Sequence, residues 1–178
     1  GAALADILFG RVSPSGRLPV TFYRSADDLP GFEDYSMRGR TYRYFEGEAL
    51  YPFGHGLSYV PIEYLSCTVE REAVPAGEAQ RVSVRLRNAG EMDAREAVLL
   101  FIRDRNERGV CLPQRRLAGF KKVEISAGGE KEVWISIPPD LMAYTDEDGR
   151  ERLEEGTYEV ETGAAAGGIS LKASFRLV

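Results

Sequence analysis

The sequence predicts a mainly β protein, with a β-sandwich that follows a short α/β segment and an aromatic-rich strap. Three observations support this. From residue 62 onward, short runs of alternating apolar and polar residues are separated by turns, as in a sandwich. Residues 32–59 hold five of the nine tyrosines and three of the eight phenylalanines, too many for a disordered linker. Residues 1–22 show helical and then strand-like spacing of apolar residues.

The C-terminal part of the chain is expected to contain seven strands. They lie near residues 64–70, 80–88, 97–103, 119–125, 130–137, 156–162 and 169–177. Seven strands in about 115 residues is typical of a fibronectin-III-like or immunoglobulin-like domain, which we assign to residues 62–178. Tyr158, near the start of the sixth strand, is expected to play the structural role of a tyrosine corner.

Two of these strands depart from the usual alternation. In residues 97–103 one face is apolar, but Leu99 and Phe101 make the opposite face apolar as well. A strand of this kind must be covered on its outer face, so we predict that the strap or the α/β segment packs there. Trp134 lies on the polar face of its strand. Packing against another domain or chain is one interpretation, and a platform for stacking sugars is the other.

The N-terminal third is expected to be two units. Residues 1–9 have helical spacing with Gly10 at the expected end, and residues 18–22 alternate like a short strand. We assign residues 1–26 to the end of an α/β sandwich domain and residues 27–61 to the strap. A lone helix and strand cannot bury their apolar faces, and the chain does not begin with Met, so we expect a longer parent protein.

Composition limits the partners that the chain can have. A net charge of -5 argues against a nucleic-acid surface, and no apolar run is long enough to span a membrane. Cys67 and Cys111 lack metal-ligand spacing. We interpret them as free, buried or half-buried thiols, with a single disulfide as the alternative, and therefore expect a cytoplasmic location.

Several motifs, in order, resemble one enzyme family. Residues 51–59 read Tyr-Pro-Phe-Gly-His-Gly-Leu-Ser-Tyr, residues 10–19 read Gly-Arg-Val-Ser-Pro-Ser-Gly-Arg-Leu-Pro, and residues 88–90 and 117–120 follow downstream. Together they resemble glycoside hydrolase family 3, the β-glucosidase and β-xylosidase family. The resemblance covers essentially the whole chain and implies that the strap links an α/β sandwich domain to a fibronectin-III-like domain.

The resemblance also implies what the chain does. It would be the C-terminal region of a retaining β-glycosidase that hydrolyses terminal β-linked sugars, with a domain-packing role. Its partners would be the barrel and α/β sandwich domains of the parent, and carbohydrate would be the parent's substrate. The family's two catalytic carboxylates lie on segments outside this chain, so we expect no catalytic residue, cofactor or metal here. The alternative is a stand-alone β-sandwich module that binds carbohydrate or protein.

A few residues are candidates for other roles. Arg40, Tyr42 and Arg43 could rim a carbohydrate pocket formed with the missing domains, or could form salt bridges and stack at the domain junction. His55, the only histidine, is expected to be a hydrogen-bonded structural imidazole. The acidic turn at residues 146–149 lacks the downstream ligands of a calcium loop.

Overall fold

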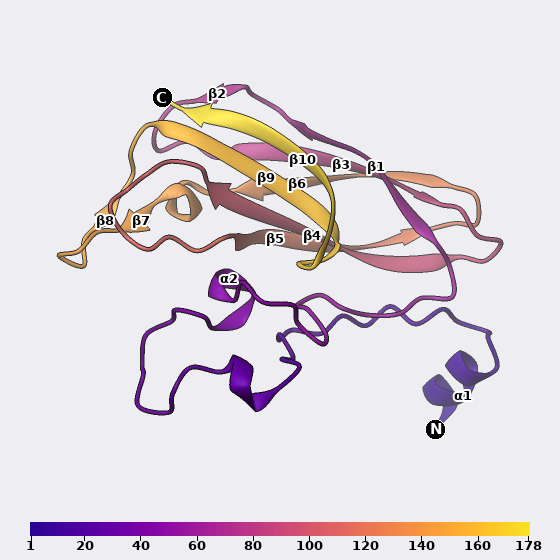
Figure 1. The fold of residues 1–178 in the computed structure, drawn as a ribbon. Coiled ribbons are helices and arrows are strands. Elements are labelled where there is room, and N and C mark those ends of the chain that lie inside the picture. Colours follow the sequence, from indigo (N-terminus) through magenta and orange to yellow (C-terminus); the bar gives the residue numbers. More distant parts are fainter.

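The computed structural model describes residues 1–178 and shows a β-sandwich lying over an N-terminal segment that has no sheet of its own (Figure 1). That segment contains the helix α1 (Ala2–Leu8), the 3-10 turn η1 (Ala26–Asp28) and the single-turn helix α2 (Thr41–Tyr44). None of the helices is long and apolar enough to cross a bilayer.

The sandwich consists of two sheets. The smaller has the order β1 (Ile62–Val69), β3 (Gln80–Asn88), β6 (Glu130–Ile137). The larger has the order β2 (Ala73–Val74), β10 (Gly168–Leu177), β9 (Gly156–Ala165), β4 (Ala94–Asp104), β5 (Arg116–Ile125). Neighbouring strands are antiparallel, except that β2 runs parallel to β10. A turn, η2 (Pro139–Met142), precedes a small hairpin of β7 (Tyr144–Thr145) and β8 (Glu151–Arg152).

All seven predicted strands are present, and the mainly β fold is confirmed. The strands β2, β7 and β8 were not predicted, because two residues are too few to show an alternating pattern. Strand β4 begins at Ala94, before its predicted start at residue 97, and includes the charged Glu96 at a buried position. Tertiary contacts, rather than local preference, set these strand ends.

One apolar core lies between the two sheets. It holds the inward-facing side chains of β3, β4, β6, β9 and β10, such as Leu86, Leu100 and Ile137. Tyr158 is fully buried, stacks on Phe175 with ring centroids 5.6 Å apart, and donates a hydrogen bond of 2.8 Å to the carbonyl of Met142. This bond to an upstream carbonyl is the structural role predicted for Tyr158.

The N-terminal segment differs from the prediction at one point. The helix at residues 1–9 is present as α1, but residues 18–22 form no strand. Phe22 makes only an isolated bridge to Tyr51, and Leu18 pairs with the strap through its backbone groups. Proline at residues 19 and 52 removes the donors that a regular ladder needs, so the two segments run side by side without forming a sheet.

Candidate functional site

The outer face of β4 is covered by the strap, as the sequence predicted. Leu99 and Phe101 are buried, 6% and 0% exposed, beneath Tyr42 and Phe53. The rings of Tyr42 and Phe53 stack with centroids 4.5 Å apart, and Phe101 meets them edge-on at 5.7 and 6.2 Å. The Tyr42 hydroxyl accepts a hydrogen bond of 3.0 Å from the backbone N–H of Leu117. This cluster joins the strap to the larger sheet.

Two glycines allow the strap to lie so close. Gly54 has φ +84°, and a Cβ there would lie 2.5 Å from the side chain of Leu99. A Cβ at Gly56 would lie 2.2 Å from the carbonyl oxygen of Gly16. Only glycine fits either position without a shift of the neighbouring chain. Gly54 therefore combines a positive φ with a close contact, whereas Gly56 has the close contact alone.

Backbone hydrogen bonds fix the strap along the edge of the sandwich. The N–H of Ala166 donates to the carbonyl of Phe53 at 2.8 Å, and the N–H of Gln114 donates to the carbonyl of Arg43 at 2.7 Å. The Gln114 side chain donates to the carbonyl of Phe45 at 3.0 Å. These bonds satisfy strap groups that would otherwise be buried without partners.

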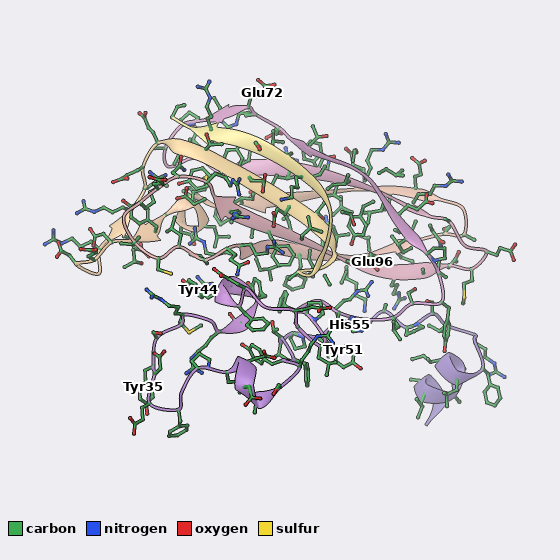
Figure 2. The ribbon with its side chains drawn as sticks, viewed as in Figure 1. Tyr35, Tyr44, Tyr51, His55, Glu72 and Glu96 are labelled. Carbon is green, nitrogen blue, oxygen red and sulfur yellow. The ribbon has the colours of Figure 1, made fainter.

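A buried ion pair ties all three parts of the chain together. Arg17 Nη2 lies 2.6 Å from Glu96 Oε2, and these side chains are 11% and 1% exposed. Arg17 also donates to the carbonyl of Gly56 in the strap at 2.6 Å, and Tyr64 donates to Glu96 at 3.0 Å. Burial, and then the Glu96 charge, raise the pKa of Tyr64 well above its ordinary value. Figure 2 shows Glu96 at the side of the sandwich that faces the strap.

Sequence reasoning did not identify this ion pair. One signal could have revealed it: Glu96 is in phase with Val98, Leu100 and Ile102, so it occupies a core-facing position of an apolar strand. A carboxylate at such a position needs a cationic partner. No pattern in the sequence, however, identifies Arg17, 79 residues away, as that partner.

The three predicted site residues do not converge on one point. Arg40 donates to the carbonyls of Ser36 and Asp34 and so shapes its own loop. Tyr42 packs against the sandwich, and Arg43 points into a separate hollow beside α2. Their contact with a sugar stays a prediction.

The remaining candidate residues have local contacts. The imidazole of His55 packs against the ring of Tyr51, with centroids 4.8 Å apart, and not through the hydrogen bond that we expected (Figure 2). Trp134 is 40% exposed, with the guanidinium of Arg81 4.8 Å from its ring centroid. This leaves both interpretations of Trp134 as predictions.

The acidic turn and the cysteines have simple surroundings. Asp146 accepts hydrogen bonds from the backbone of Arg150 and the side chain of Arg152, which hold its pKa below the usual range. No group of three or more possible metal ligands comes together.

Both cysteines are free, and Cys67 is half-buried as predicted, whereas Cys111 is exposed because it lies in the loop between β4 and β5.

Exposed apolar side chains gather in the N-terminal third. Fourteen of the eighteen large hydrophobic residues that are exposed lie in residues 1–59, and the sandwich has only Leu65, Phe120, Trp134 and Val178. Leu8 and Phe9 of the α1 region are 71% and 79% exposed. The strap is therefore covered by the sandwich on one side and open on the other, as Figure 1 shows.

Together, these observations describe a two-sheet β-sandwich with an aromatic strap packed on one side and an open apolar surface beyond it. Residues 1–59 match the model of the glycosyl hydrolase family 3 C-terminal domain, and residues 96–166 match the fibronectin type III-like domain. The chain belongs to glycosyl hydrolase family 3 and corresponds to the C-terminal part of its members.

Relatives and solved structures agree with this assignment. A xylan 1,4-beta-xylosidase of Xylanibacter ruminicola is 38% identical over 93% of this chain and 19% of its own length. Thermostable beta-glucosidase B of Acetivibrio thermocellus is 34% identical over 99% of this chain and 25% of its own. The crystal structure of a Bifidobacterium adolescentis GH3 beta-glucosidase superposes with a TM-score of 0.85 at 32% identity, over 99% of this chain and 28% of that one. The chain thus spans between 19% and 28% of the length of these three proteins.

Proposed function

We propose that this chain is the C-terminal region of a retaining β-glycosidase for terminal β-linked sugars, in which it docks the catalytic domains without supplying a catalytic carboxylate. The observation that carries the proposal is the one-sided burial of residues 1–59. Their inner side is bonded to the sandwich, while the outer side leaves side chains such as Leu8 and Phe22 exposed. An apolar surface of this kind needs a partner.

The geometry suggests how docking works. The aromatic cluster and the Arg17–Glu96 pair lock the strap to the sandwich, so the open face is presented by a rigid support. In the parent enzyme the barrel and α/β sandwich domains would cover that face. Arg40, Tyr42 and Arg43 would lie near the edge of the carbohydrate pocket, where Arg40 orders the loop at residues 34–40.

A chimera tests the docking role. The matching C-terminal region of the Xylanibacter ruminicola enzyme is replaced by this chain, and hydrolysis of an aryl β-xyloside is measured. We expect the chimera to be active and the isolated chain to be inactive. A soluble, folded chimera without activity, or hydrolysis by the isolated chain at an enzyme-like rate, would contradict the proposal.

A matched pair of variants locates the docking surface. Leu8→Glu places a charge on the open N-terminal face, whereas Phe120→Glu places one on an exposed position of the sandwich, 69% exposed. Both variants should fold normally as isolated chains, because neither side chain is buried. Only Leu8→Glu should lower the activity and thermal stability of the chimera, since a charge at an apolar interface loses its hydration without gaining a partner. Equal effects from the two variants count against this surface.

A further inference from the structure

The hollow into which Arg43 points is separate from the aromatic cluster and lies where α2 meets the β7–β8 hairpin. Its volume is about 200 Å³. Its lining includes Arg43 and Tyr44 of the strap, Asp104 of β4, Arg116 of β5, and Asp140 and Glu151 near the hairpin. Figure 2 shows Tyr44 where the strap faces the sandwich. The domain-docking role does not use these residues.

The two arginines of this hollow have unused donors. The guanidinium of Arg43 forms no ion pair, its Nε is buried without a hydrogen-bond partner, and its closest aromatic contact is the ring of Tyr44, with the centroid 5.7 Å away. Arg116 donates only to the carbonyl of Leu141. Burial, and then the nearby charge of Arg43, lower the pKa of Arg116 from its ordinary value. Guanidinium N–H groups left unpaired in a hollow favour a ligand that accepts hydrogen bonds.

The acidic groups decide the charge of that ligand. Asp104 is already neutralised by Arg108, with Arg108 Nε 3.0 Å from its carboxylate. Asp140 and Glu151 are exposed, line the same hollow, and have no side-chain partner. The two unpaired guanidinium groups, Arg43 and Arg116, are matched by the two unpaired carboxylates, Asp140 and Glu151. The hollow therefore has no excess of positive charge, which favours a neutral ligand over an anion.

We propose that this hollow binds a single neutral sugar ring. Adjacent hydroxyl groups of a pyranose would accept from Arg43 and Arg116 and donate to Asp140 and Glu151, and a ring face would lie against Tyr44 or Tyr144. The hollow is smaller than the roughly 300–1,000 Å³ of sites for drug-sized ligands, which suits one ring and not an extended chain.

Cys111 provides a direct readout, because its exposed thiol lines the hollow. Modification by N-ethylmaleimide at neutral pH is followed by mass spectrometry in the presence of methyl β-D-xylopyranoside or methyl β-D-glucopyranoside. Cys67 contributes little, because burial raises its pKa to about 11 and keeps the thiol protonated. We expect saturable protection of Cys111 by at least one of the glycosides.

Variants separate this site from others on the same chain. Arg43→Met keeps the apolar stem but removes the donors, and Glu151→Gln changes an exposed acceptor, so both should fold. Each should weaken glycoside binding by about tenfold, the scale expected when a hydrogen bond to a charged group is lost. Trp134→Ala, on the outer face of the smaller sheet, should leave binding unchanged.

Three outcomes would overturn the proposal. The first is protection by inorganic phosphate but by neither glycoside, which would make the hollow an anion site. The second is no protection by any probe. The third is protection that survives Arg43→Met but is lost in Trp134→Ala. None of these results bears on domain docking, which the chimera tests separately.

Discussion

The sandwich and the N-terminal third bury their apolar groups in different ways. The sandwich closes on itself: two sheets cover one core, and few large hydrophobic side chains remain exposed. The first 61 residues have no core of their own. Their main apolar contact is with the outer face of β4 and the turn between β9 and β10, and α1 has no buried residue. The N-terminal third therefore depends on the sandwich for the burial of its inner side, while its outer apolar side is the surface that we propose another domain covers.

The largest effect should come from breaking the contact between the two regions. Phe101→Ala removes a fully buried ring that belongs to the sandwich but packs on the strap. We expect a loss of about 3–5 kcal/mol in the free energy of unfolding, the usual cost of a large aromatic cavity. Urea denaturation measures it. The control is Phe120→Ala on the neighbouring strand, because the side chain of Phe120 is 69% exposed. Comparable losses of unfolding free energy in the two variants would mean that the strap adds nothing to the burial of Phe101.

The buried ion pair should come next. Glu96→Gln leaves the Arg17 charge buried without a carboxylate, which we expect to cost about 3 kcal/mol, near the lower end for breaking a buried pair. The matched control is Glu48→Gln, because Glu48 pairs with Arg24 at the same 2.6 Å but is 82% exposed. That variant should lose less than about 1 kcal/mol. Equal losses in urea denaturation would show that burial does not set the strength of these pairs.

A smaller effect is expected within the sandwich alone. Tyr158→Phe keeps the stack on Phe175 but removes the hydrogen bond to the carbonyl of Met142. The buried carbonyl then lacks its partner, at a cost of about 1–2 kcal/mol. Hydrogen exchange should show the loosening around η2, with the strap unchanged. A change that spreads to the strap would contradict the separation of the two regions.

The smallest effect concerns alkaline pH. Burial raises the pKa of Cys67 from 9.0 to about 11, and it also raises the pKa of Tyr64 and Tyr158 above their ordinary value of 10.0. The unfolded chain then loses these protons first, so the stabilisation is present below pH 9 and is lost as the pH rises past 9 toward the folded values. Urea midpoints measured between about pH 8 and pH 11 give the slope, because these groups titrate in roughly that range. Tyr64→Phe should flatten it, and an unchanged slope would exclude Tyr64 as a source.

The sequence by itself determined the fold class, the seven main strands and the covered outer face of β4. Each of these depends on alternation of apolar residues along a strand, which is a local property.

Only the tertiary structure decided which groups meet across long separations. The pairing of Arg17 with Glu96, the hollow between Arg43 and Arg116, and the loss of a strand at residues 18–22 all depend on how the strap lies on the sandwich. Charged and aromatic side chains have many possible partners, and local sequence does not choose among them. The packing of the strap against β4 decides which of these groups meet. It fixes the distances between the charged groups and how deeply they are buried, and these two quantities set whether an ion pair is favourable or costly.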